Sequence, residues 1–253
     1  MSETVPIDAL PGHGAAFILT FPGLDEEEAG RRLNELRSLG VDAIELRGRH
    51  AVRGYPIMGK GHVGIVIAAR VGGHPVALKV RRMDADRESL EYEAERLRVA
   101  NGVSVGPRLL GVSRNFLLME LVEGSYLSDW LKDREGDEPE RVRALLAGLL
   151  SKTRRLDEAG LDHGELSRAT RHVIVDGGEA RVVDFESAST ARRCANVTSI
   201  VQFLFFNKQM RALVGRVLPL PDGERLISSL RRYRREPGEA SFAGVLEECG
   251  LSA

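Results

Sequence analysis

The sequence MGKGHVGIV at residues 58–66, followed by VALK at residues 76–79, decides the fold class of this chain. A Gly-x-Gly-x-x-Gly run here leads into a β-prone segment, and Gly72-Gly73 separates this segment from a second apolar strand that carries Lys79. Dinucleotide-binding folds place such glycines between a strand and a helix. Because a strand follows the glycines instead, the sequence predicts a β-hairpin that covers the phosphates of a nucleotide and brings a lysine to them.

The composition narrows the class of protein. The 253 residues include 36 Lys and Arg against 37 Asp and Glu, so the chain has neither the positive excess typical of nucleic-acid binding nor the acidic excess typical of disorder. Cys194 and Cys249 are too few for a disulfide scaffold and lack the spacing of metal ligands. The first residues, MSET, are acidic where a signal peptide is basic, and no apolar run approaches the ~20 residues of a membrane helix. We expect a cytoplasmic protein with no membrane partner.

The first fifty residues are predicted to form a β-α-β extension with no catalytic residue. Residues 17–21 (FILTF) favour a short strand, and residues 41–46 alternate like a second one. Between them, the sequence predicts a helix to Leu39 with Asp25 as its N-cap. The first turn of this helix is acidic, and Gly40 follows its last residue.

The rest of the chain is predicted to be strand-rich first and helix-rich later. Asp84 or Asp86 can cap a helix that runs to Ala100. The other predicted elements are strands at 108–112 and 116–121, a short helix at 125–131, a long helix from Pro139 to Gly160, a hairpin at 173–183, and helices at 196–216, 224–235 and 239–249. This order predicts an α+β molecule of two lobes.

Phosphoryl transfer requires a lysine, a carboxylate that holds it, a metal-binding acid and a base, and the chain offers candidates for each of these groups. A buried Lys79 needs a carboxylate partner, which the next helix can supply from Glu88, Glu91, Glu93 or Glu95. Glu93 is our choice, because it is spaced to lie beside the apolar face of Leu90 and Leu97.

Two further acids precede and follow the predicted hairpin at 173–183. Glu165 lies in LDHGEL (161–166), and Asp184 lies in VVDFE (182–186). A loop and a strand end joined through one hairpin can converge on a single site. We therefore expect Asp184 to bind a metal ion and Glu165 to accept or orient the proton of the nucleophile. We expect His163 to position the loop by hydrogen bonds.

These motifs together resemble the protein-kinase superfamily. The matching segments are Gly59–Gly64, Val76–Lys79, Leu118–Gly124, His163–Ser167 and Asp184-Phe185, in the family's order. The match is closest to the compact atypical branch, namely the RIO kinases and the small archaeal kinase of the KEOPS tRNA-modification complex. The resemblance implies a bilobal kinase-like fold, with a β-rich N-lobe at residues 51–122 and a reduced helical C-lobe at residues 123–253.

The resemblance also implies a phosphoryl donor, a metal and site residues. In these families the glycine loop covers ATP, the segment matching residues 120–122 binds adenine through its backbone, and Met119 would guard the back of the adenine pocket. The residues assigned in this way to ATP binding are Gly59, Lys60, Gly61, Gly64, Val66, Ala77, Lys79, Glu93, Met119, Glu120 and Val122. Lys79, Glu165 and Asp184 would be catalytic, with Mg²⁺ or Mn²⁺ as the metal and an unidentified protein as the substrate.

The chain departs from the family pattern at three positions. Glu165 stands where the pattern has aspartate, and Glu186 replaces the glycine of Asp-Phe-Gly, a glycine that RIO-type kinases also lack. The metal-binding asparagine is replaced by Thr170 or, with two residues inserted, by His172. No Ala-Pro-Glu motif follows Glu186, so recognition of peptides on the usual platform is not expected.

Three functions remain open from the sequence. The first is an ATP-dependent atypical serine/threonine protein kinase. The second, motivated by Glu165 and the missing asparagine, is an ATP-binding pseudokinase or ATPase switch in an RNA-processing assembly. The third is a small-molecule phosphotransferase like the aminoglycoside phosphotransferases. The basic cluster at residues 231–235 can serve RNA binding or form an exposed helix surface.

Overall fold

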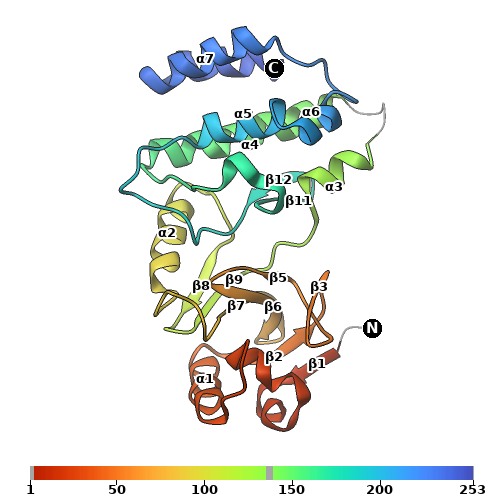
Figure 1. The fold of residues 1–253 in the computed structure, drawn as a ribbon, viewed down its shortest axis with the longest axis vertical. Helices are drawn as coiled ribbons and strands as arrows, with labels where there is room; N and C mark the ends of the chain where they lie inside the picture. Colours follow the sequence, from red (N-terminus) through yellow and green to blue (C-terminus); the bar gives the residue numbers. More distant parts are fainter. Residues whose placement is uncertain (1–2, 135–138, 253) are drawn as a thin grey trace. The chain divides into compact units, whose positions relative to one another are not determined.

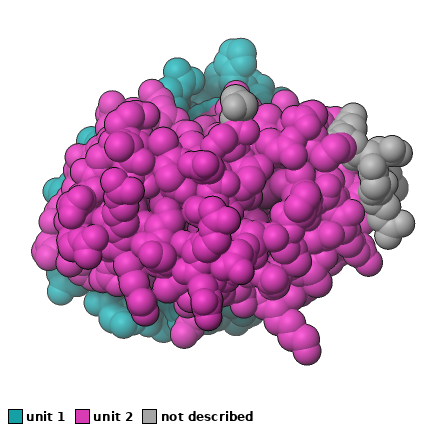
Figure 2. Space-filling model, turned by 90° about the horizontal axis from the view of Figure 1, so that it is seen from above, with its two compact units in different colours: residues 1–98, 107–121 teal, residues 99–106, 122–253 magenta. Residues whose placement is uncertain are grey.

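The structure, a computed structural model, describes residues 3–134 and 139–252. The chain divides into two compact units, residues 1–98 with 107–121 and residues 99–106 with 122–253, coloured teal and magenta in Figure 2. The protein is of the α+β class, as predicted, and its main sheet is antiparallel.

The first unit contains a seven-stranded sheet with the order β1-β2-β6-β7-β9-β8, and β5 also pairs with β6 (Figure 1). The helix α2 (Glu91–Gly102) follows β7 and ends within the second unit. The other elements are β1 (Glu3–Pro6), η1 (Ile7–Gly12), η2 (Gly14–Thr20), α1 (Glu26–Ser38), β2 (Val41–Leu46), β3 (His50–Val52), β4 (Tyr55–Ile57), β5 (Gly59–Lys60), β6 (Gly64–Val71), β7 (His74–Arg81), β8 (Leu109–Val112) and β9 (Phe116–Glu120).

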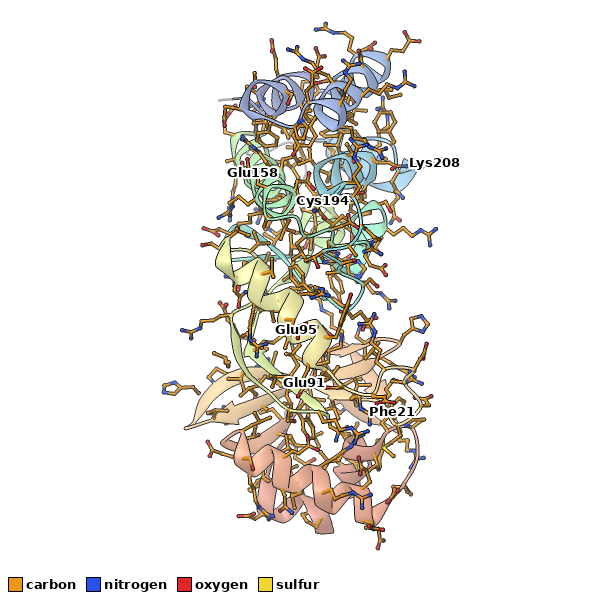
Figure 3. The ribbon with its side chains drawn as sticks, turned by 90° about the vertical axis from the view of Figure 1, so that its left-hand side faces the viewer. Phe21, Glu91, Glu95, Glu158, Cys194 and Lys208 are labelled. Atoms are coloured by element: carbon orange, nitrogen blue, oxygen red, sulfur yellow. The ribbon has the colours of Figure 1, made fainter. Side chains whose placement is uncertain are left out.

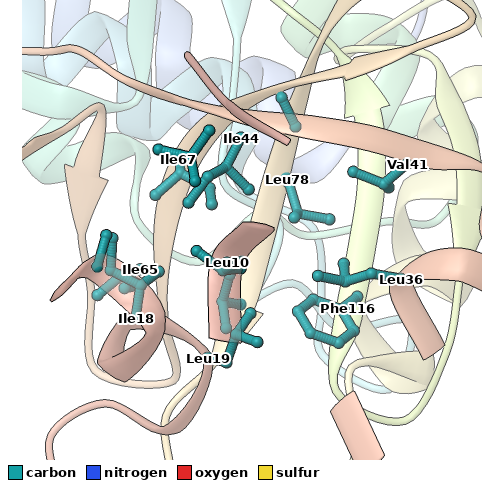
Figure 4. Packing of buried hydrophobic residues seen from close by; sticks show 14 of the residues in the cluster. Leu10, Ile18, Leu19, Leu36, Val41, Ile44, Ile65, Ile67, Leu78 and Phe116 are labelled. Atoms are coloured by element: carbon teal, nitrogen blue, oxygen red, sulfur yellow. The ribbon is translucent and has the colours of Figure 1, made fainter. Parts of the chain in front are cut away.

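One face of this sheet forms the core of the unit. Ile67, Leu78 and Leu118 are paired across β6, β7 and β9, so they point to the same side. They pack with Leu10 of η1, Leu36 of α1 and other apolar residues of the N-terminal segment in one buried cluster (Figure 4). The first fifty residues therefore cover this face and contribute β1 and β2 to the same sheet.

The opposite face carries Lys79 among small or aliphatic side chains. Val66 lies beside Lys79, and Ala77 lies beside Met119. Because alternate residues of a strand point to opposite faces, these four side chains lie on the side away from the Leu78 cluster. The alternation in VALK thus separates the core from the candidate site.

Two predictions for the N-terminal segment need correction. Residues 17–20 of the predicted strand at 17–21 belong instead to the 3-10 helix η2, and Phe21 follows its end; His13 Nδ1 accepts a hydrogen bond from Ala15 N at its start. This apolar run is buried along its whole length, so periodicity could not distinguish a strand from a helix. The strand at Glu3–Pro6 was missed, because only Val5 of its four residues is buried.

The helix expected after Asp84 or Asp86 begins later than predicted. Asp84 accepts hydrogen bonds from the Arg82 guanidinium at 2.8 and 2.7 Å, so its carboxylate does not cap α2. Glu91 N instead donates to Ser89 Oγ at 3.1 Å.

The second unit is mainly helical. Its elements are β10 (Ser125–Tyr126), α3 (Leu127–Lys132), α4 (Pro139–Glu158), η3 (Leu166–Arg171), β11 (Val173–Asp176), β12 (Glu179–Val182), α5 (Asn196–Phe205), α6 (Lys208–Val214), α7 (Gly223–Arg235) and α8 (Glu239–Glu248). The predicted hairpin is β11–β12, and β10 extends it to three strands. The helix predicted at 196–216 is two helices, because the Asn207 side chain accepts from Gln209 N and Met210 N and caps α6.

Candidate functional site

Lys79 and Glu93 form a buried ion pair in the first unit. Lys79 Nζ lies 2.8 Å from Glu93 Oε2 and 3.0 Å from Oε1, and each side chain is 4% exposed. The pairing expected from the sequence is therefore present. Burying two charges is unfavourable unless their geometry is good, so such a pair restricts where both side chains can lie.

The position of Glu93 on α2 explains why it is the partner. Glu88, Glu91 and Glu95 are exposed; Figure 3 labels the last two on α2. Glu93 is 3% exposed, and its neighbour Ala94 is fully buried.

The glycine loop is a tight turn between β5 and β6. Gly61 N donates to Gly64 O at 2.8 Å, and Met58 N donates to Val66 O at 2.9 Å. Gly64 lies against the stem of Lys79: a Cβ added there would come within 3.0 Å of Lys79 Cγ and 2.8 Å of Val80 O. Because this glycine has no side chain, the loop can pack closely against the stem of Lys79.

The remaining residues assigned to the loop lie differently. A Cβ at Gly59 would meet Val66 Cβ at an ordinary 3.7 Å, so this glycine has room for a methyl group. Lys60 is exposed, and its ammonium lies 5.1 Å from the centre of the Phe21 ring. Arg82 contacts the same ring at 5.2 Å.

The residues assigned to the adenine pocket line the face that carries Lys79. Ala77 is 6% exposed, whereas Val66 and Met119 are half-buried. Glu120 N donates to Arg108 O, and Glu120 Oε2 accepts from Arg108 N at 3.0 Å. The segment predicted to bind adenine through its backbone spans the boundary between the units, with Glu120 in the first and Val122 in the second.

In the second unit, the loop at residues 161–165 is held by backbone pairing. Asp162 N donates to Ser189 O at 2.9 Å, and Ser189 N donates to Asp162 O at 2.8 Å. Gly164 has a φ of +87°, and a Cβ there would come within 2.9 Å of Ser187 O. Glycine is therefore required at this turn.

His163 positions this loop from inside the unit. Its side chain is fully buried, and its Nε2 donates to Val183 O at 3.1 Å, since a carbonyl can only accept. Burial, with a smaller contribution from His172, lowers the pKa of His163 to about 4. A neutral imidazole in this place agrees with the structural role predicted for it.

The buried Asn196 and the partly buried Asp157 form a hydrogen-bond network that the sequence did not reveal as part of the site. Asn196 Oδ1 accepts from His163 N at 2.8 Å, and its Nδ2 donates to Leu161 O at 2.8 Å. Asp157 in turn accepts from Asn196 Nδ2 at 2.8 Å and from Tyr233 Oη at 3.1 Å. The network fixes both sides of the loop to α4, α5 and α7.

Glu165 follows Gly164, and its carboxylate is half-buried. Ser187 Oγ donates to Glu165 Oε1 at 2.8 Å. Ser187 was not singled out in the sequence, because its contact joins two segments 22 residues apart.

Asp184 is the second residue after the strand β12, which ends at Val182. Its φ of +68° is unusual for a residue other than glycine, and backbone strain of this kind clusters at functional sites. Its side chain is 36% exposed, and Oδ2 lies 3.9 Å from His172 Nε2.

This geometry distinguishes between the two residues that could replace the family's metal-binding asparagine. Thr170 is exposed, and its hydroxyl donates to Arg168 O at 3.5 Å. His172 lies beside Asp184, with its ring 5.6 Å from the His163 ring. His172 is therefore the better placed of the two to complete a metal site with Asp184.

The residues around Asp184 fit a divalent metal ion. Ligand atoms of Asp184 and Glu186 lie within 4.8 Å of each other. Carboxylate oxygens suit Mg²⁺ and Mn²⁺, whereas an imidazole is a less suitable ligand for Mg²⁺. Asp184 with Glu186 fits either ion, and His172 adds a nitrogen beside them.

The basic cluster at residues 231–235 lies on α7. Its four arginines are exposed, and Tyr233 between them is buried against Asp157. The helix thus presents a cationic surface, while RNA binding stays a prediction.

No protein-family model matches this chain, and no curated protein matches its sequence. Among residues 3–134 and 139–252, no helix combines the length and the apolarity needed to cross a membrane.

The ion pair predicts a specific pattern of stabilities. Lys79→Met leaves the Glu93 carboxylate buried without its cation, so we expect the free energy of unfolding to fall by about 3–5 kcal/mol. The double variant Lys79→Met/Glu93→Leu replaces both charges by apolar groups and should regain most of this loss. Urea denaturation of the natural protein, of Lys79→Met, of Glu93→Leu and of the double variant measures the effect. A double variant that loses the sum of the two single losses would contradict the pairing.

The buried His163 predicts a dependence of stability on pH. In the unfolded chain this imidazole binds a proton below its ordinary pKa of 6.5, whereas in the folded chain it stays neutral down to about pH 4. Its contribution to stability is therefore complete above pH 6.5 and is lost as the pH falls toward 4, by about 3 kcal/mol. Denaturation between pH 7 and pH 4 should show a smaller loss for His163→Gln than for the natural protein. Equal losses would contradict the assignment.

Proposed function

We propose that this protein is an ATP-dependent phosphotransferase of the atypical, RIO-like kinase type, which transfers the γ-phosphoryl group of ATP to a hydroxyl group. The observation that carries the proposal is the buried pair of Lys79 and Glu93, which lies under Gly64 on the face of the sheet away from the core. It supports the binding of nucleotide phosphates by the first unit.

The energetics of the pair favour a functional role. A buried ion pair contributes little to net stability compared with apolar residues of the same size. The other face of the same strands is packed with aliphatic side chains, so such residues fit this sheet. A lysine retained among Val66 and Ala77 is best explained by a negatively charged ligand on that face.

The second unit supplies the groups that a transfer reaction needs. Asp184, with Glu186 or His172 beside it, would hold Mg²⁺ or Mn²⁺, which when bound neutralises charge on the phosphates. Glu165 would orient the acceptor hydroxyl and take its proton. His163 and Asn196 hold the loop that carries Glu165. The bilobal kinase fold is part of this proposal, with the two units as its lobes.

A second candidate is an ATP-binding switch that does not transfer phosphate. The observation in its favour is Thr170, which is exposed and bonded to Arg168 O, where the family pattern has a metal-binding asparagine. A metal shell without that ligand would weaken transfer more than nucleotide binding.

The proposal is tested with labelled ATP, Mg²⁺ or Mn²⁺ and a generic protein acceptor. We expect transfer by the natural protein and a loss of about 100-fold or more in Asp184→Ala and in Glu165→Gln. The folded double variant Lys79→Met/Glu93→Leu should lose both ATP binding and transfer. Asp176→Ala, at the last residue of β11, is the matched control and should keep its activity.

Transfer that survives both Asp184→Ala and the double variant would exclude the proposed mechanism. Thermal stabilisation by ATP without any transfer would favour the nucleotide switch instead.

A further inference from the structure

Ser187 makes the contact that an acceptor hydroxyl would make. Its Oγ donates to Glu165 Oε1 at 2.8 Å, within the range of about 2.6–3.2 Å expected between a base and the proton it removes. Glu165 is the carboxylate that the proposed function uses as the base. The protein thus supplies a hydroxyl of its own to that carboxylate.

The backbone of Ser187 is fixed on both sides. Ser187 O accepts from Arg192 Nη2 at 2.6 Å, and it approaches Gly164 so closely that a Cβ there would lie 2.9 Å away. Ala188 N donates to Phe185 O, which forms a turn just after Asp184. The hydroxyl is therefore held in place beside Glu165 rather than sampling many positions.

Neighbouring hydroxyls have other partners. Ser189 Oγ accepts from Ala191 N at 3.1 Å, and Thr170 Oγ1 donates to Arg168 O. Ser187 is also half-buried rather than fully buried.

We propose that Ser187 is an internal phosphoryl acceptor, activated by Glu165 of its own chain. The inference rests on the proposed function, which supplies ATP as the donor. Ser187 Oγ would form a bond to the γ-phosphorus while the bond from that phosphorus to the β–γ bridging oxygen breaks, and ADP leaves. The Ser187 proton passes to Glu165, and the product is a phosphoserine ester.

Arg192 is placed to receive this product. Its guanidinium contacts Ser187 O and also lies 3.0 Å from Asp162 Oδ2 through Nε. Phosphoserine adds about two negative charges next to Glu165, and an adjacent arginine offsets such charge by charge-assisted hydrogen bonds. The phosphate would then occupy the place of an external acceptor, so the modification would slow further transfer.

The test is mass spectrometry of the full chain after incubation with ATP and Mg²⁺. We expect one phosphate, located at residue 187. Ser187→Ala should reduce self-labelling at least tenfold, and Ser187→Thr, which keeps the hydroxyl, should restore labelling at the same position. Ser189→Ala is the matched control and should label like the natural protein. Stabilisation by ATP shows that each variant is folded.

A second arm tests whether the reaction stays within one chain. The rate per molecule should not change over a 100-fold range of protein concentration. The natural protein should also leave Ser187 of an Asp184→Ala chain unlabelled. Labelling of that chain at residue 187 would overturn activation by its own Glu165.

The results separate this inference from the proposed function. Transfer to an added acceptor with self-labelling absent, or located at another residue, overturns the inference and leaves the function standing. The absence of ATP binding, of transfer and of self-labelling overturns both.

Discussion

The candidate site of the first unit depends on the buried contact between Lys79 and Glu93. A lysine that is only 3% exposed needs a carboxylate at hydrogen-bond distance, and Glu93 supplies it from α2. The contact fixes the rotation of that helix, so that Glu91 and Glu95 face solvent. The loop above it packs closely, because a Cβ at position 64 would come within 2.8 Å of Val80 O and 3.0 Å of Lys79 Cγ. Strand, helix and loop thus meet at one pair of charges.

The alternation of residues in the sheet keeps this charged face separate from the core. Leu78 points into the cluster formed with the N-terminal segment, while Lys79, the next residue, points away from it. The segment before residue 50 therefore serves as the hydrophobic cover of the sheet. A comparable separation occurs in the second unit. There the buried Asn196 and His163, with the partly buried Asp157, hold a loop whose next carboxylate, that of Glu165, is half-buried.

The sequence predicted those features that depend on local pattern or on motif order. Periodicity and turn signals predicted the β6–β7 and β11–β12 hairpins, and capping predicted the long helix from Pro139. The need to neutralise a buried lysine predicted the partnership of Lys79 with Glu93. The features it missed depend on contacts between distant segments. Asn207 interrupts a predicted helix because its side chain caps the next one. Ser187 and Asn196 gain their roles from partners 22 and 33 residues away, which no local pattern reveals.

The central claim is that Lys79, held by Glu93 beneath Gly64, binds the phosphates of a nucleotide. Calorimetric titration of ATP with Mg²⁺ into Gly64→Ala and Gly59→Ala tests it most directly, because both changes add one methyl group to the same loop. The added methyl at position 64 would press on Lys79 and Val80 O, whereas at position 59 it would meet Val66 at an ordinary distance. We predict that Gly64→Ala weakens binding by about tenfold or more, equivalent to about 1.4 kcal/mol, and that Gly59→Ala stays close to the natural protein. Equal affinities of the two variants would contradict the account.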